Sequence, residues 1–310
     1  MSDLRVSLGR LTLPNPILVA AGTFGYGLEF ARAVPLDQLG GLITKTLTLA
    51  PREGHPPPRL VETPAGMLNA VGLQNIGLEA FLKEKLPALR RVRTPLIVSI
   101  LGERPEEVAA MAKRLDAADG VAAMELNLSC PNLRRTSSGR ARFVSIAAHD
   151  AEATRAFVQA ARGQTRKTLL AKLSPDVTDL TPIAQAAEQA GADALTLGNT
   201  FVGMRIDPAT RRSSLGAATG GLSGPAIRPL ALYRLWYTVQ TIRIPVIGLG
   251  GIARAEDAVE FFIAGASAVA VGTATFADPR AALRILHGLS RYLARHGFAS
   301  VRALSGSWQE

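Results

Sequence analysis

Eight short apolar runs spaced along the chain most constrain the fold of this sequence. They are rich in Val, Ile and Leu without strict alternation, which is typical of parallel strands covered on both faces. The runs are residues 15–21, 41–48, 95–101, 123–129, 168–174, 194–200, 245–251 and 268–274. Most are separated by stretches with helical spacing, such as 78–91, 105–118, 177–190 and 255–264. Eight strand–helix units in about 250 residues predict an α/β fold, a (β/α)8 TIM barrel.

The composition fits a single domain of this kind. With 310 residues, 47% of them hydrophobic, the chain can bury one large core, and no shift in composition marks a linker. We therefore expect one domain over residues 1–310. A single cysteine excludes an internal disulfide, and residues 1–7 contain no apolar stretch of the kind found in signal peptides or membrane spans. These features predict a cytoplasmic protein without a membrane partner.

The formal net charge of +10, from 35 basic and 25 acidic residues, favours anionic ligands and raises the question of nucleic acid. Most of this charge is arginine spread along predicted helices, as at residues 90–93 and 291–295, and no basic tract is rich in aromatic residues. The pattern is typical of a solvated helix surface. We therefore predict no nucleic-acid partner.

Polar residues gather where the predicted strands end. In a barrel these ends meet on one face, where the active site is built. Each residue singly has a structural alternative, because a lysine can extend to solvent and an asparagine or glycine can close a turn. Their recurrence on several strands favours a shared site. The residues are Lys45, Thr46, Ser99, Asn127, Ser129, Cys130, Lys172, Ser174, Asn199, Thr200, Gly250, Gly251, Gly272 and Thr273.

Lysine usage indicates what this site binds. The chain has six lysines and 29 arginines, and two of the lysines, Lys45 and Lys172, lie inside apolar strands that carry no acidic residue. Because a buried ammonium without a partner is unstable, an anionic or carbonyl-rich ligand over the barrel mouth is predicted.

Glycines after the last two predicted strands indicate a phosphate group on that ligand. The segments GLGGI at 248–252 and VGTA at 271–274 let backbone amides approach a bound group closely. Loops at these two positions commonly bind phosphate in this fold. The glycine spacing fits neither a Walker loop nor a dinucleotide fingerprint.

Cys130 is the only cysteine and lies in NLSCPN at 127–132, directly after a predicted strand. A thiol at the barrel mouth is a candidate catalytic group, whereas a lone cysteine is more commonly a small buried residue. The four histidines are far apart in the sequence, so we predict no metal site. There is also no Gly-x-Ser-x-Gly nucleophile elbow.

Four long motifs resemble dihydroorotate dehydrogenase of class 1, subtype B. They are KT at 45–46 with PAGMLNAVGLQN at 64–75, NLSCPN at 127–132, NTFVGM at 199–204 and TGGLSGPAI at 219–227. Their order resembles the family over almost the whole chain. Cysteine rather than serine at position 130 and the lack of an N-terminal membrane segment point away from a resemblance to the membrane-associated class 2.

The resemblance implies FMN at the barrel mouth and oxidation of (S)-dihydroorotate to orotate in pyrimidine biosynthesis. It implies that Cys130 is the general base, which removes the C5 proton while hydride passes from C6 to flavin N5. Lys45 would contact flavin and substrate and stabilise negative charge on the substrate. Lys172 would lie at the N1 and O2 edge of the flavin.

Two sets of binding residues follow from the same resemblance. The substrate set is Lys45, Asn69, Ala70, Val71, Gly72, Leu73, Asn127, Asn199 and Thr200. The flavin set is Ala21, Lys45, Thr46, Ser99, Asn127, Lys172, Leu197, Gly224, Gly250, Gly251, Gly272 and Thr273, with the last four around the phosphate.

Two positions depart from the family pattern. Ser99 stands where asparagine is usual in this subtype, so one flavin hydrogen bond is expected to be shorter in reach, water-mediated or missing. The segment LRRTSSGRAR at 133–142 lacks the glycine-rich pattern of the family. It is expected to cover the site as a lid, or to bring its arginines to a partner subunit or an unusual electron acceptor.

The resemblance also implies partners. Subtype B enzymes work with a second subunit that carries FAD and an iron–sulfur cluster and passes electrons to NAD. One cysteine is too few for a cluster on this chain. We expect a homodimer, or a heterotetramer with such a subunit, and fumarate or a quinone is the alternative acceptor.

Three other functions stay open on sequence alone. A tRNA-dihydrouridine synthase-like flavoenzyme would add a helical RNA-binding domain, yet the chain after residue 274 has room for only one long helix, at 279–296. A non-catalytic flavin electron-transfer protein would not depend on Cys130. A phosphate-binding barrel isomerase would be colourless.

Overall fold

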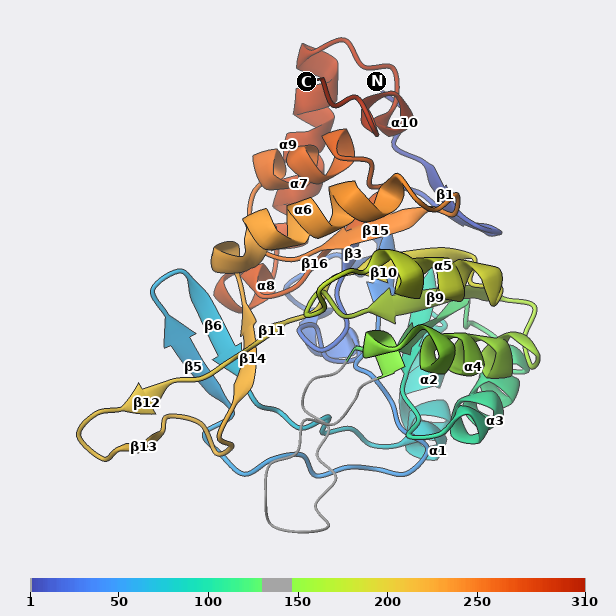
Figure 1. The fold of residues 1–310 in the computed structure, drawn as a ribbon. Coiled ribbons are helices and arrows are strands. Elements are labelled where there is room, and N and C mark those ends of the chain that lie inside the picture. Colours follow the sequence, from blue (N-terminus) through green and yellow to red (C-terminus); the bar gives the residue numbers. More distant parts are fainter. Residues whose placement is uncertain (1, 130–146, 310) are drawn as a thin grey trace.

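The computed structural model describes residues 2–129 and 147–309. Eight parallel strands close into a barrel in the order β10-β15-β16-β3-β4-β7-β8-β9, and helices surround it (Figure 1). The strands are β3 Ile17–Val19, β4 Gly41–Ile43, β7 Leu96–Ile100, β8 Ala123–Asn127, β9 Thr168–Leu173, β10 Ala194–Leu197, β15 Val246–Leu249 and β16 Ala268–Val271. Each falls within one of the eight predicted runs. The predicted (β/α)8 barrel is confirmed.

The outer layer is built mainly from amphipathic helices. Their bounds are α1 Leu78–Ala80, the π-helical turn η3 Phe81–Lys85, α2 Leu86–Leu89, α3 Pro105–Asp116, α4 Ala151–Arg162, α5 Thr181–Gln189, α6 Arg228–Val239, α7 Ala255–Ile263, α8 Ala274–Ala277, α9 Ala281–Arg295 and α10 Val301–Leu304. Helix α3 begins with Pro105 and two glutamates and carries Lys113 and Arg114 in its last turn, charges that complement the helix dipole. Among the described residues, no helix combines the length and apolarity that a bilayer crossing requires.

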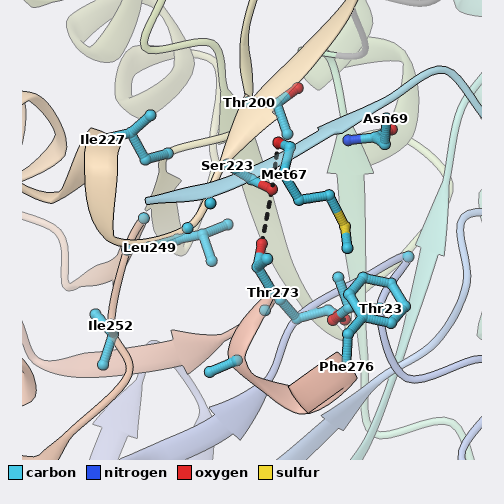
Figure 2. A pocket seen from close by; sticks show the side chains of 18 of the residues that line it. Thr23, Met67, Asn69, Thr200, Ser223, Ile227, Leu249, Ile252, Thr273 and Phe276 are labelled. Carbon is cyan, nitrogen blue, oxygen red and sulfur yellow. Dashed lines mark hydrogen bonds between the residues drawn. The ribbon is translucent and has the colours of Figure 1, made fainter. Parts of the chain in front are cut away.

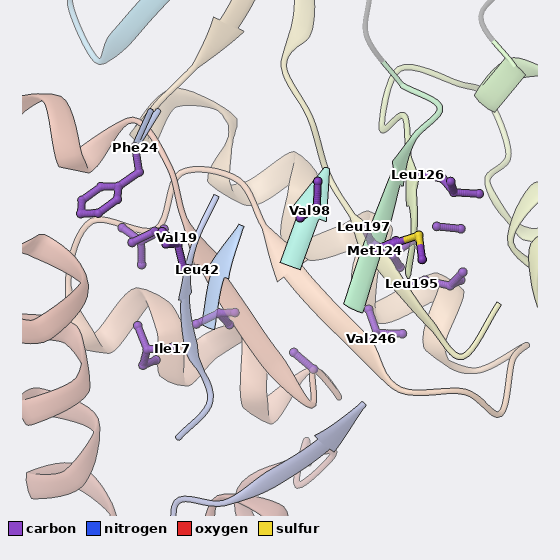
Figure 3. Close-up of a cluster of buried hydrophobic side chains, with 14 of the residues drawn as sticks. Ile17, Val19, Phe24, Leu42, Val98, Met124, Leu126, Leu195, Leu197 and Val246 are labelled. Atoms are coloured by element: carbon purple, nitrogen blue, oxygen red, sulfur yellow. The ribbon is translucent and has the colours of Figure 1, made fainter. Parts of the chain in front are cut away.

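One apolar cluster lies between the barrel and the helices. Strand residues that point outward, such as Val98, Met124 and Leu195, are fully buried (Figure 3), and they belong to the same cluster as helix residues such as Met111 and Phe261. Because side chains alternate between the two faces of a strand, the neighbouring residues point into the barrel.

The inside of the barrel changes from apolar to polar along the strands. Leu18, Ile97, Ala123 and Leu170 belong to the interior cluster, which the hairpin of β1 Val6–Leu8 and β2 Leu11–Leu13 closes from below. Two residues further along β7, β8 and β9, the interior positions become Ser99, Glu125 and Lys172, all buried. These inward-facing polar residues form the floor of a site at the C-terminal face of the barrel.

A second, smaller sheet lies beside the barrel mouth (Figure 1). It is antiparallel, in the order β11-β14-β6-β5, with β5 Leu60–Thr63, β6 Gly66–Asn69, β11 Phe201–Gly203 and β14 Gly220–Ser223. A hairpin of β12 Ile206–Asp207 and β13 Arg212–Ser213 projects beyond it. The 3-10 turns are η1 Leu28–Phe30, η2 Leu36–Gln38, η4 Ala147–His149 and η5 Pro225–Ile227. This sheet was not predicted from the sequence, because its strands are only three or four residues long and mix apolar residues with polar residues or glycine.

Candidate active site

A cavity of about 560 Å³ opens at the C-terminal face of the barrel. Strand ends line it, together with β6 and β14 of the smaller sheet and the short helix α8. Figure 2 shows Ile227, Leu249 and Ile252 on one side, and Asn69 and Phe276 on the other. The volume lies within the range of ordinary ligand pockets, about 300–1,000 Å³.

The cavity brings together most of the predicted site residues. Fifteen of them line it: Ala21, Lys45, Thr46, Asn69, Val71, Leu73, Asn127, Lys172, Asn199, Thr200, Gly224, Gly250, Gly251, Gly272 and Thr273. Cys130, the predicted general base, lies outside the described residues, as does the segment 133–142. The chain segments that supply these residues are far apart in the sequence, and they meet because the barrel closes and the smaller sheet lies beside its mouth.

Four predicted residues do not line the cavity. Ser99 is buried below it, where it contacts Thr46 and Glu125. Leu197 is 2% exposed and belongs to the apolar cluster outside the barrel. Ala70 is buried in the small cluster of the second sheet, and Gly72 packs against His55 so closely that a Cβ would lie 2.0 Å from His55 Cδ2.

Lys172 places a positive charge in the floor of the cavity. The residue is 3% exposed and lies opposite Asn127 in the pairing of β8 and β9. Among the described residues, no side chain forms an ion pair with it. Because an ammonium this deep needs compensation, the site is electrostatically suited to a ligand that carries or develops negative charge.

A hydrogen-bonded group of amides and hydroxyls covers the neighbouring part of the floor. Asn127 Nδ2 donates to Thr46 Oγ1 over 3.0 Å, and Ser129 Oγ donates to Asn127 Oδ1 over 3.2 Å. Asn199 Nδ2 donates to Ser129 Oγ over 2.7 Å, while Asn199 Oδ1 accepts from the backbone of Thr200 over 2.8 Å. These contacts fix the amide planes, so the site presents defined donors and acceptors to a bound ligand.

The smaller sheet supplies another wall. Asn69 Nδ2 donates to the carbonyl of Gly221 over 3.2 Å, which ties β6 to β14. Leu73 has φ +59°, a conformation that side-chain-bearing residues rarely adopt, and Asn75 Nδ2 donates to its carbonyl over 2.8 Å. Such backbone strain is concentrated at functional sites.

The opposite end of the cavity is built from glycines. Gly250 and Gly251 have φ +136° and +73°, and a Cβ on Gly251 would lie 2.7 Å from Arg228 Cβ, so the loop after β15 packs closely on the start of α6. At Gly272 a Cβ would meet nothing nearer than 3.6 Å. The missing side chain there leaves space within the cavity, and a phosphate group fits such a cradle.

The sequence analysis missed several lining residues. Met67 and Ser223 lie within the motifs that carried the resemblance, so their segments gave the signal but the single residues did not. Ile227 and Ile252 end the segments 219–227 and 248–252 that had been singled out, but nothing marked these two apolar residues themselves, and Phe276 of α8 lies in no such segment. In the described part of the chain, no cluster of side chains is arranged to hold a metal ion.

Comparison with known proteins decides the family. Residues 3–293 match the family model described as dihydroorotate dehydrogenase. The chain belongs to the dihydroorotate dehydrogenase family. The resemblance inferred from the motifs is confirmed, and this family is flavin-dependent in general.

Individual relatives agree. Dihydroorotate dehydrogenase B (NAD(+)), catalytic subunit, of Trichlorobacter lovleyi is 49% identical over 304 residues, covering 98% of both chains. The proteins of the same name from Pelobacter propionicus and Thermodesulfovibrio yellowstonii are 50% and 47% identical, over 98% and 100% of both chains. A crystal structure of DHODH from Eimeria tenella in complex with ferulenol has a TM-score of 0.81 over 98% of this chain and 88% of that one. At 23% identity, that structure supports the fold of a dihydroorotate dehydrogenase alone.

Proposed function

We propose that the cavity at the barrel mouth binds FMN and dihydroorotate together, and that residues 1–310 act as one FMN-binding barrel domain. The enzyme is an oxidoreductase of pyrimidine biosynthesis that converts dihydroorotate to orotate. One observation carries the assignment of this reaction to the cavity. A buried lysine and three asparagine side chains, Asn69, Asn127 and Asn199, converge there on a single space.

The residues fit a flavin nucleotide. Lys172 supplies positive charge beside the floor, and the open position at Gly272 with the positive-φ Gly251 supplies a cradle for a phosphate. When bound, FMN would accept the hydride that leaves C6 of the substrate. Lys172 would then stabilise negative charge at the N1 and O2 edge of the flavin.

The amides would orient the substrate ring. A pyrimidine ring presents carbonyl oxygens and N–H groups in alternation, and asparagine side chains offer both donors and acceptors. We assign this role to Asn69, Asn127 and Asn199, with Thr200 and the backbone of residues 70–73 alongside. Lys45, which lines the same cavity, would stabilise the negative charge that builds on the ring as the C5 proton leaves.

The proposed general base is Cys130, on the grounds of the family resemblance. A thiol has an ordinary pKa of about 8.5, so positive charge nearby would favour the thiolate that removes the C5 proton. The proton would pass from C5 to the Cys130 sulfur as the C6 hydride departs, and two electrons would leave the substrate in that step.

A separate subunit would take the electrons onward. The relatives at 47–50% identity are named catalytic subunits, a name that implies a second subunit. We propose that this partner carries FAD and an iron–sulfur cluster and reduces NAD, in a heterotetramer built on a homodimer of this chain. Fumarate or a quinone would be the acceptor without it.

Mixing the purified protein with dihydroorotate in the absence of oxygen tests the proposal. We expect prompt loss of the flavin absorbance near about 450 nm, with orotate formed in equal amount. Orotate added instead of dihydroorotate is the control and should not bleach the flavin. A yellow protein that dihydroorotate does not bleach would contradict the substrate assignment, and a protein that stays colourless with added FMN would contradict the flavin.

A further inference from the structure

Glu125 is a carboxylate enclosed inside the barrel, below the cavity. It is 0% exposed, does not line the cavity, and precedes Asn127 by two residues on β8, so both side chains point into the barrel. A buried carboxylate requires hydrogen-bond donors, and two hydroxyls provide them. Ser99 Oγ donates to Oε1 over 3.0 Å, and Thr196 Oγ1 donates to Oε2 over 3.2 Å.

The contact with Ser99 fixes the direction of the next hydrogen bond. Thr46 Oγ1 and Ser99 Oγ lie 3.0 Å apart, and either hydroxyl has the geometry to donate. Ser99 has only one hydrogen, which Glu125 accepts, so Thr46 must be the donor in this pair. Thr46 Oγ1 then has no hydrogen left and can only accept.

This order of hydrogens, together with the contacts of Ser129, orients the amide of Asn127. The atom that faces Thr46 over 3.0 Å must be a donor, which is the Nδ2 group of Asn127. Its Oδ1 atom is accordingly turned to Ser129, which donates from Oγ over 3.2 Å and from its backbone over 3.4 Å. Asn127 lines the cavity, and its Nδ2 group retains a second hydrogen that Thr46 does not use.

We propose that Glu125 is a positioning residue for the substrate ring. By accepting from Ser99, it sets the order of hydrogens through Thr46 and presents Asn127 to a ring carbonyl as a donor. Without the carboxylate, the hydroxyls of Ser99 and Thr46 are free to turn, and only the long contacts with Ser129 still favour the donor orientation of Asn127. This inference rests on the proposed function, because it takes the pyrimidine ring as the ligand.

Two matched variants separate this role from simple support of the barrel. Ser99→Ala and Thr196→Val each remove one buried hydroxyl from Glu125, but only Ser99 leads on to Thr46 and Asn127. We expect Ser99→Ala to weaken orotate binding by about tenfold, the usual scale for one misplaced hydrogen bond. Its KM for dihydroorotate should rise similarly, with kcat changing less. Thr196→Val should leave the affinity for orotate and the KM for dihydroorotate within about twofold of the wild-type values.

Replacement of the carboxylate provides a second measurement. Methionine is close to glutamate in length and adapts to irregular spaces, so Glu125→Met should fold. We expect it to weaken orotate binding as Ser99→Ala does. Because Ser99 and Glu125 act through one chain of contacts, the double variant Ser99→Ala, Glu125→Met should bind orotate no more weakly than either single variant.

Calorimetric titration with orotate, thermal unfolding and FMN content are measured on all four proteins and the wild type. Equal effects of Ser99→Ala and Thr196→Val on orotate binding, or additive effects in the double variant, would overturn the role of Glu125. A wild-type protein that neither binds orotate nor is bleached by dihydroorotate would overturn the proposed function, and the inference with it. If the wild type binds orotate and is bleached by dihydroorotate, but Ser99→Ala and Thr196→Val bind orotate equally well, only the inference is overturned.

Discussion

The hydroxyl of Thr273 donates to the hydroxyl of Ser223 over 2.8 Å, a contact that joins the loop after the last barrel strand to the smaller sheet (Figure 2). Both residues line the cavity. The contact therefore fixes the Thr273 side chain at the end of the cavity where we propose the flavin phosphate. It also explains how a sheet outside the barrel contributes to a site built on barrel strands.

Ser223→Ala removes the acceptor of this bond. We expect the affinity for FMN to fall about threefold, since one neutral hydrogen bond contributes roughly 0.5–1.5 kcal/mol. Ser305→Ala is the control, because Ser305 Oγ donates to the carbonyl of Ala266 over 2.8 Å and Ser305 does not line the cavity. Fluorescence titration of the apoprotein with FMN measures the FMN affinity of both variants. Equal affinities for the two variants would show that the Thr273 contact does not affect flavin binding.

Gly251→Ala tests the glycine end of the cavity. Gly251 and Gly297 share φ +73°, but a Cβ on Gly251 would lie 2.7 Å from Arg228 Cβ, whereas nothing lies within 4 Å at Gly297. We expect Gly297→Ala to lower the free energy of unfolding by about 1–2 kcal/mol, through backbone strain alone. Gly251→Ala should lower it by roughly 1–3 kcal/mol more, through overpacking, and should also weaken FMN binding. Denaturant unfolding and FMN titration check this, and unchanged FMN affinity in Gly251→Ala would contradict the placement of the phosphate.

Lys172→Ala tests the buried charge. We expect FMN to bind at least about tenfold more weakly, as for the loss of a charged hydrogen bond, and the flavin potential to fall because the reduced ring loses its nearby cation. Lys167→Ala is the control, since Lys167 donates to the carbonyls of Ala118 and Val121 just before the same strand. Unchanged affinity and potential in Lys172→Ala would remove its proposed flavin contact.

The barrel was predictable because parallel strands that are buried on both faces consist largely of apolar residues, and such runs can be recognised in the sequence. The strands in runs 95–101 and 268–274, LIVSI and AVAV, are buried along their whole length, and such burial on both faces favours the apolar, Val- and Ile-rich content that was visible in the sequence. The smaller sheet was not predictable on this ground. Its strand β14, with the sequence GGLS, pairs through backbone contacts that glycine allows and leaves no apolar signature.

The candidate site was predictable where residues act through their position at strand ends. Lys45, Asn127 and Lys172 line the cavity because the C-terminal ends of parallel strands meet there. Ser99 shows the limit of that argument. It is also an inward-facing residue of a strand, yet it lies below the cavity and contacts Glu125, and sequence alone does not give the depth of a residue within the barrel.

The contact between Thr165 and Asp116 should stabilise the protein in a way that depends on pH. Thr165 Oγ1 donates to Asp116 over 2.5 Å, and this bond lowers the pKa of the Asp116 carboxyl below its ordinary value of 3.8. A lowered folded-state pKa means that the unfolded chain binds the proton first as pH falls. The stabilisation is therefore complete above pH 3.8 and is lost as pH falls from 3.8 through the lower, folded-state pKa.

Thr165→Val should therefore lower the melting temperature at pH 7, and its difference from wild type should shrink below pH 3.8. Thr238→Val is the control, because Thr238 Oγ1 donates to the carbonyl of Arg234 over 2.7 Å and a carbonyl does not titrate. The difference in melting temperature between Thr238→Val and the wild type should be the same at pH 7 and below pH 3.8. A difference for Thr165→Val that does not change with pH would contradict the role of the carboxylate.

Cys130→Ser tests the proposed base. Serine keeps the size of the side chain but its hydroxyl is a far weaker base near neutral pH, so FMN should bind as in the wild type while dihydroorotate oxidation slows by about 100-fold or more, the usual scale of general base catalysis. Cys130→Ala should slow dihydroorotate oxidation by as much, because both variants lack a thiolate. Anaerobic stopped-flow bleaching of the flavin measures the reductive half-reaction without any electron acceptor, so the result does not depend on the partner subunit. Rising pH should speed the wild type through the titration of the thiol and leave the serine variant slow across the same range. Near-normal bleaching by Cys130→Ser would assign proton removal to another group and leave the cysteine without a catalytic role.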